Sequence, residues 1–169
     1  MLALGEETVS TIPKPLDDLY TAHHGMVFRT AHRITGNAAD AEDVLQTVFL
    51  RLVRRESLDE IENPESYLRR SAVNAALDVV RARHESDTLE MEKLPSSGSC
   101  TELRELRDTL RRILSKLPGR SAEMFAMRFF EGYSNQEIAK LMNLSQVVVA
   151  VTLHRTRRKV QKELRGGSR

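Results

Sequence analysis

Hydrophobic residues recur at steps of three and four along most of the chain, which is the spacing of one face of an α-helix. In the N-terminal half, this pattern predicts helices over residues 16–35, 39–55 and 64–84. Pro64 suits the first position of the third helix, and Asn63 suits its cap. The three helices are short enough to pack on one another as a small bundle.

The periodic pattern stops in a stretch that is rich in Pro, Ser and Gly, and this stretch is interpreted as a linker. After it, the pattern predicts helices over about 101–117, 120–131, 134–142 and 145–164. We therefore expect an all-α fold of two small helical domains joined by a flexible linker. The expected boundaries are a flexible leader at 1–15, a first domain at 16–84, the linker at 85–101 and a second domain at 102–165.

The last two predicted helices carry clear boundary signals. Ser134 and Glu137 have the spacing of a capping box, and Asn143 can adopt the left-handed conformation that ends a helix. Ser145 can then cap the long basic helix that follows. A short helix joined by about three residues to a long basic one is typical of a helix-turn-helix. A plain helical hairpin with a solvated basic face is the alternative.

The charge is unevenly distributed along the 169 residues. Residues 104–165 hold 14 Lys and Arg against 6 Asp and Glu, whereas the rest of the chain holds 12 against 18. The net charges are therefore +8 and −6, although the whole chain carries only +2. This asymmetry predicts that the C-terminal half attracts polyanions. Two solvated surfaces of opposite sign would give the same count.

The sequence lacks the motifs that mark several other classes of protein function. The chain has no phosphate-binding glycine motif, no H-E-x-x-H and no cysteine pair, so we expect no enzyme, no metal and no cofactor. No apolar run approaches the ~20 residues that cross a bilayer, and the N-terminus does not resemble a signal peptide. The lone Cys100 cannot form an internal disulfide, so we expect a reducing, cytoplasmic location.

Four segments resemble one protein family in the right order. They are DAEDVLQTVFLRLVR at 40–54, PESYLRRSAVNAALDVVRARH at 64–84, LPGRSAEMFAMRFFEGYSNQEIAKLMNLS at 117–145 and LHRTRRKV at 153–160. Together they resemble the sigma-70 family, specifically the small extracytoplasmic-function (ECF) sigma factors. The resemblance implies a protein that binds bacterial core RNA polymerase, directs it to promoter DNA and helps to open the duplex. It also implies an anti-sigma factor as a regulator.

The resemblance assigns roles to residues of the first domain. The segment at 40–54 matches the family's polymerase-docking helix, and the third helix matches its promoter-melting helix. The implied polymerase contacts are Asp40, Asp43, Gln46, Phe49 and Leu50. The implied contacts to the minus-ten element are Tyr67, Arg69, Arg70, Asn74, Arg81 and Arg83. The loop at 56–63 would capture a flipped base, although its acidic residues repel phosphate.

The last helix matches the family's minus-thirty-five recognition helix, with one departure. The implied DNA contacts are Ser145, Gln146, Val147, Val148, Ala150, Val151, His154, Arg155 and Arg158. Valines and an alanine stand where the family usually carries polar residues. The valines can read thymine methyl groups directly. Alternatively, the helix holds only phosphates through its arginines and reads the element weakly. In the third interpretation the valines bind a protein. The sequence leaves these three interpretations open.

Two other functions remain possible from the sequence. A stand-alone helix-turn-helix regulator would explain the C-terminal half, but it has no use for a polymerase-docking helix. A sigma-like helical interaction protein, such as an inactive antagonist, would explain the altered recognition helix. Promoter recognition with polymerase is the expectation that accounts for all four segments.

Overall fold

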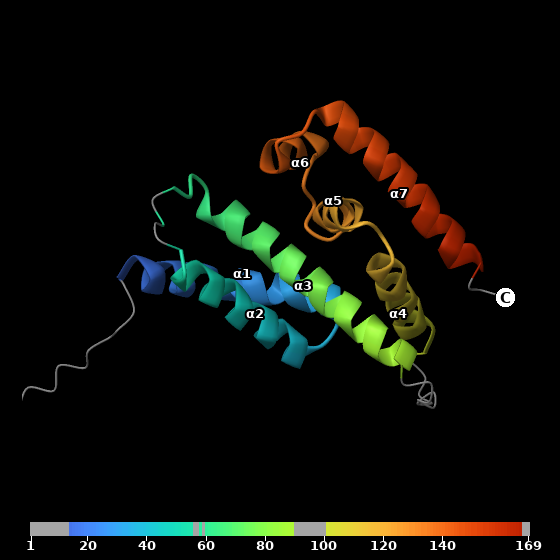
Figure 1. The fold of residues 1–169 in the computed structure, drawn as a ribbon, viewed down its shortest axis with the longest axis horizontal. Coiled ribbons are helices and arrows are strands. Elements are labelled where there is room, and N and C mark those ends of the chain that lie inside the picture. Colours follow the sequence, from blue (N-terminus) through green and yellow to red (C-terminus); the bar gives the residue numbers. More distant parts are fainter. Residues whose placement is uncertain (1–13, 56–57, 59, 90–100, 167–169) are drawn as a thin grey trace, which may run out of the picture.

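The computed structural model describes residues 14–55, 58, 60–89 and 101–166, and this part of the chain contains seven α-helices and no strand (Figure 1). In order they are α1 (Lys14–Thr35), α2 (Ala38–Val53), α3 (Pro64–Leu89), α4 (Thr101–Ser115), α5 (Gly119–Phe129), α6 (Asn135–Met142) and α7 (Gln146–Gly166). The prediction of an all-α fold is confirmed. Helix α1 begins at Lys14, inside the expected leader, and α3 continues past residue 84 to Leu89, inside the expected linker.

Helices α1, α2 and α3 pack on one another as a three-helix unit (Figure 1). Their contact faces follow the three- and four-residue spacing of the sequence, because those positions fall on one side of each helix. Each helix contributes small and medium aliphatic side chains that are almost fully buried. They include Val27 and Ile34 from α1, Val44, Val48 and Leu52 from α2, and Leu68, Ala72 and Leu77 from α3.

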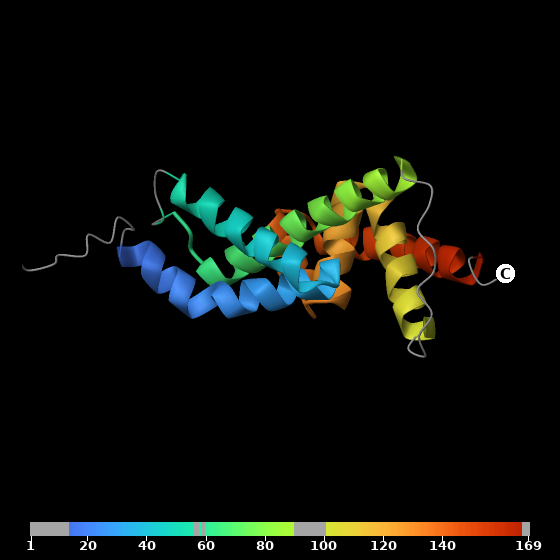
Figure 2. The same cartoon turned by 90° about the horizontal axis from the view of Figure 1, so that it is seen from below.

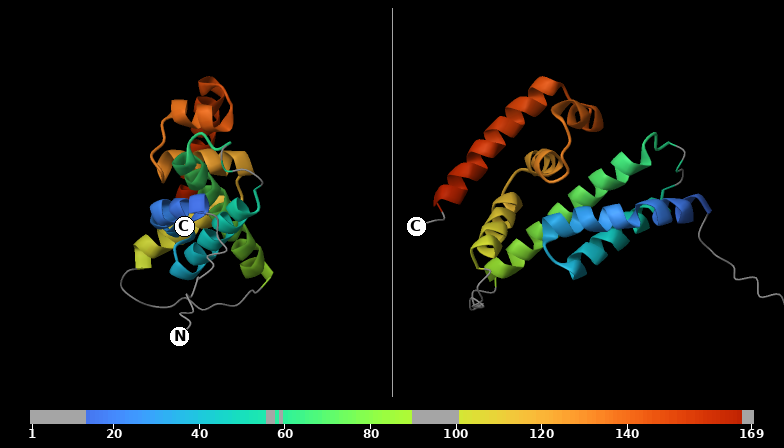
Figure 3. Two further views of the ribbon diagram at one scale, coloured as in Figure 1. Left: turned by 90° about the vertical axis from the view of Figure 1, so that its left-hand side faces the viewer. Right: turned by 180° about the vertical axis from the view of Figure 1, so that it is seen from behind.

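The remaining helices form a second group in which α5 lies between α3 and α7 (Figure 3). Met127, Ile138 and Val149 are fully buried where α5, α6 and α7 meet. Helix α4 contacts both α3 and α7, and it lies near the C-terminal end of α3 in the view of Figure 2. The two helical groups therefore touch along α3.

The expected caps of the last two helices are present. Ser134 accepts a hydrogen bond from the Glu137 amide at 3.2 Å, and the Glu137 carboxylate accepts one from the Ser134 amide at 2.7 Å. Asn143 ends α6 with a φ of 53°, in the left-handed region. The Ser145 hydroxyl accepts from the Val148 amide at 3.2 Å and begins α7. Asn143 and Ser145 thus fix the turn that joins α6 and α7, and the capping box fixes the start of α6.

The capping box should make α6 sensitive to acid. Hydrogen bonds from Ser134, the backbone one first, hold the pKa of Glu137 below its usual value. A depressed carboxyl pKa contributes stability above the unfolded value of 4.5, and this contribution disappears as the pH falls through the folded pKa. We expect Glu137→Gln to be less stable than the wild type at pH 6, with the difference shrinking as the pH falls below 4.5 and through the folded pKa. Urea unfolding at several pH values measures this difference, and a constant difference would contradict it.

Candidate nucleic-acid and protein interfaces

Helix α2 presents an exposed row of side chains on the side away from the core. Asp43, Gln46, Leu50 and Val53 follow each other at helical spacing, and all four are exposed. Leu50 is 54% exposed and Val53 is 55% exposed. Large apolar side chains held in solvent next to polar ones are typical of a protein-binding surface. Val53, which was not among the predicted contacts, lies three residues after Leu50 and extends this exposed row.

Two predicted polymerase contacts of α2 have internal partners instead. Asp40 is buried, and both its oxygens lie 2.8 Å from the Arg83 guanidinium. The ring of Phe49 is buried too, with its centre 4.9 Å from that of Tyr20. The structure therefore gives Asp40 and Phe49 a packing role. The same ion pair engages Arg83, which the sequence analysis had predicted to contact DNA.

The predicted minus-ten residues lie on more than one face of α3, and all of them except Arg83 are half-buried. Tyr67 lies near the start of the helix. The Arg55 guanidinium lies 5.2 Å from its ring centre and donates to its hydroxyl at 3.2 Å. Arg81 pairs with Asp78 on its own helix at 3.2 Å. The residues between them, Arg69, Arg70 and Asn74, face the C-terminal helices.

Glu131, just after α5, is the centre of one contact between the two helical groups. Its side chain is fully buried, and Thr30 and Arg69 donate to it at 2.9 Å each. Arg33 lies 3.0 Å from its other oxygen. Burial lowers the pKa of Arg69, but hydrogen bonds to Glu131 and Glu65 outweigh it, so the net pKa is raised. Arg69 therefore stays charged in this contact.

Glu123 of α5 makes a second contact with α3. Arg70 donates to its carboxylate at 2.6 Å and Asn74 donates to it at 3.0 Å. Arg70 also donates to the Leu141 carbonyl of α6 at 2.6 Å. Three of the six predicted minus-ten residues are thus bonded to α5, to α6 or to Glu131 just after α5. The sequence analysis assigned no role to Glu123 or Glu131.

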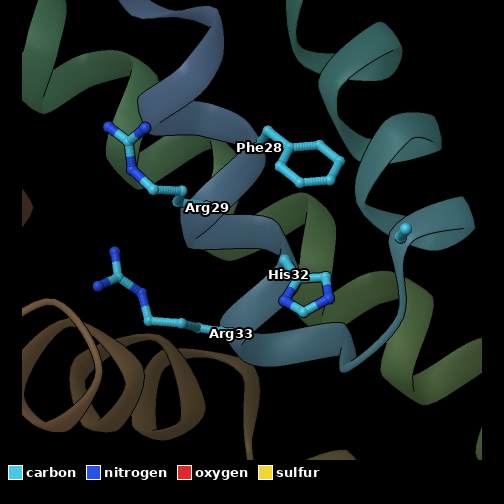
Figure 4. Close-up of a pocket in the computed structure, with 5 residues that line it drawn as sticks. Phe28, Arg29, His32 and Arg33 are labelled. Carbon is cyan, nitrogen blue, oxygen red and sulfur yellow. The ribbon is translucent and has the colours of Figure 1, made fainter.

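A pocket of about 370 Å³ lies beside α1 and is lined by Phe28, Arg29, His32, Arg33 and Ala38 (Figure 4). Figure 4 shows Phe28 and His32 on the α2 side of the helix, where their rings stack at 6.0 Å. The described lining contains no carboxylate, hydroxyl or thiol.

Helix α7 has one buried side and one exposed side. Val149, Leu153, Thr156 and Val160 are buried against the preceding helices. Val147, at 72% exposure, Val148, at 46%, and Val151, at 44%, face solvent in its first turns. The other predicted contacts on or beside this helix are also exposed: Ser145, Gln146, Ala150, His154, Arg155 and Arg158. The structure thus leaves the predicted minus-thirty-five residues accessible from the start of α7 to Arg158.

Comparison with known proteins agrees with these features. Residues 19–85 match the family model described as Sigma-70 region 2, and residues 107–160 match the model described as Sigma-70, region 4. The RNA polymerase sigma-E factor of Streptomyces coelicolor is 30% identical over 141 residues, which cover 82% of this chain and 79% of the relative. The ECF RNA polymerase sigma factor SigW of Bacillus subtilis is 24% identical over 164 residues, or 88% of each chain.

The fold also resembles a solved structure. The sigma factor RpoE of Bartonella quintana, crystallised with the anti-sigma factor NepR, aligns with a TM-score of 0.53 at 15% identity. The alignment covers 90% of this chain and 98% of that one. Among the described helices, none combines the length and the apolar character that a bilayer crossing requires.

Proposed function

The chain belongs to the sigma-70 family as an ECF-type sigma factor, and from this we propose which surfaces bind polymerase and promoter DNA. The observation that carries the proposal is the exposed side of α7, which is apolar in its first turns and basic beyond them. A helix of this kind, fixed by a short capped helix before it, enters the major groove in helix-turn-helix proteins. The protein would act on transcription without covalent chemistry of its own.

We propose that the exposed row of α2 binds core RNA polymerase. Asp43, Gln46, Leu50 and Val53 offer an apolar centre with a polar edge, and this composition suits a specific protein contact. Asp40 and Phe49 would hold α2 in place, because both are buried and contact Arg83 of α3 and Tyr20 of α1. The surface lies on the N-terminal unit, for which we propose the boundaries 16–84 given by the sequence analysis.

The polar side chains of α3 would hold the opened minus-ten element. Tyr67 offers a ring for base stacking, and Arg69, Arg70 and Arg81 offer charges for the strand. Asn74 adds an amide that can pair with a base edge. Arg69, Arg70 and Asn74 are bonded to Glu123 and Glu131 in this structure, so they must exchange these partners for DNA. The loop proposed for base capture lies at 56–63, and residues 56, 57 and 59 are outside the described part.

The partners follow from the proposed activity. They are core RNA polymerase and promoter DNA, which place the protein in the cytoplasm. An anti-sigma factor is a further partner, as in the solved complex of the structurally similar Bartonella protein. The C-terminal unit, proposed at 102–165, would carry the minus-thirty-five contacts.

Selection from randomised DNA tests this proposal. Core polymerase alone, the chain alone and the mixture are each incubated with duplexes randomised upstream of a transcription start. We expect only the mixture to enrich a defined two-part sequence, because polymerase docking and promoter reading lie on different helices. Enrichment of the same sequence by the chain alone would favour a stand-alone regulator. Polymerase binding without any enrichment would favour a sigma-like antagonist.

A further inference from the structure

Val147, Val151 and Arg158 fall in one row along α7, because residues four and seven positions apart share a face. This row lies opposite the buried Val149 and Leu153. It begins with apolar side chains and continues with charged ones. Val148 is exposed beside the start of the row. The valines are therefore at the end of α7 that would point into the groove, and the arginine follows behind them.

The charges around the valines indicate what covers them. The exposed residues in the later turns of α7 include Arg155, Arg157, Arg158, Lys159 and Lys162. Glu163 is the only acidic residue of the helix, and it is only partly exposed. A continuous surface of cations on one helix is complementary to the closely spaced phosphates of a duplex. Promoter DNA is thus the partner that can contact both the basic and the apolar side chains of α7.

Base edges in the major groove offer valine one apolar group. This group is the C5 methyl of thymine, whereas the other positions there are hydrogen-bond donors and acceptors. Ala150, exposed on the same turn, also lacks a hydrogen-bonding side chain. Valine side chains in helices hold one χ1 rotamer, so the three form a surface of fixed shape. We propose that Val147, Val148 and Val151 recognise thymine methyl groups in the upstream promoter element.

This inference rests on the proposed function and adds the chemistry of its upstream contact. It predicts that the element enriched with core polymerase contains thymines at the positions facing α7. Replacing these thymines by uracil removes only the methyl groups and leaves every hydrogen-bonding atom in place. We expect the affinity to fall about fourfold for each methyl group removed, because the complex then loses the burial of one methyl group.

A triple variant connects the effect to the valines. Val147→Ala, Val148→Ala and Val151→Ala together keep a good helix former at each position. With core polymerase, this variant should bind the thymine and the uracil elements equally. Arg158→Ala is the matched control, because it removes a phosphate contact from the same face. It should weaken both elements alike and keep the ratio between them.

The possible outcomes distinguish a failure of thymine-methyl recognition from a failure of the proposed promoter-recognition function. If the complex enriches no sequence, the proposed function fails. If it enriches a sequence but binds the uracil form as tightly, the methyl reading is wrong and the function stands. Uracil sensitivity that persists in the triple alanine variant would also overturn the assignment, because another residue would then read the methyl groups.

Discussion

Replacing Glu123 and Glu131 together by glutamine should separate the C-terminal helices from α1 and α3. Glutamine keeps the shape of each side chain but removes the charge that Arg33, Arg69 and Arg70 face. Removing one partner of a buried ion pair costs about 3–5 kcal/mol, because the other charge is left without compensation. Arg33 is 47% exposed, so water offsets part of this cost, and we expect about 3 kcal/mol for Glu131→Gln.

Separation of the two helical groups relieves this cost, so the helices themselves do not need to unfold. The arginines become hydrated as soon as the two helical groups part. The contact between Arg111 of α4 and the Ile34 carbonyl, at 3.1 Å, remains as a weaker link. The same change frees Arg70 and Asn74 and leaves Arg69 paired only with Glu65 of its own helix. We therefore expect the double variant to bind a single-stranded minus-ten oligonucleotide at least tenfold more tightly than the wild type.

Two readouts test this prediction. Energy transfer between dyes on α2 and α7 should fall in the double variant, and anisotropy of a labelled oligonucleotide gives the affinity. Glu137→Gln is the matched control, because it removes one acidic charge from α6 without touching α3. Unchanged energy transfer and unchanged affinity in the double variant would contradict the prediction.

Leu50→Asp should abolish binding to core polymerase without unfolding the chain. Leu50 is 54% exposed, so a polar side chain there costs the N-terminal unit little. In a bound complex the new carboxylate would be buried in an apolar contact without a partner. Central contacts of this kind contribute 2 kcal/mol or more, so we expect at least a 30-fold loss of affinity.

The measurement is anisotropy of the labelled chain titrated with core polymerase. Leu103→Asp provides the control, because Leu103 is 59% exposed on α4 and lies outside the proposed docking row. It should bind like the wild type. If Leu50→Asp also keeps the wild-type affinity, the docking surface is not on this side of α2.

The helices could be predicted from the sequence because their signals are local. The spacing of apolar residues, Pro64, the capping box and Asn143 each act within a few positions. The sequence placed the end of α3 too early, because residues 85–88 are polar and break the apolar pattern. Residues 85–89 contain no glycine or proline to stop the helix. Their helical backbone is compatible with solvent exposure of residues 85–87.

The contacts between the two helical groups could not be predicted, because they join residues far apart in sequence. Glu131 pairs with arginines 62 and 98 positions away, and Glu123 pairs with Arg70 53 positions away. In the sequence each of these carboxylates is an ordinary acidic residue. The valines were visible as an anomaly, but their exposure beside a basic surface is what favours thymine over the other interpretations.

Run-off transcription tests the central claim most directly. Core RNA polymerase is incubated with the chain and a template that carries the enriched two-part element, and the labelled transcript is measured. We predict a transcript of defined length that requires both the chain and the element, and that disappears with Leu50→Asp. A transcript that forms equally without the chain, or its absence despite tight binding to core polymerase, would contradict the account.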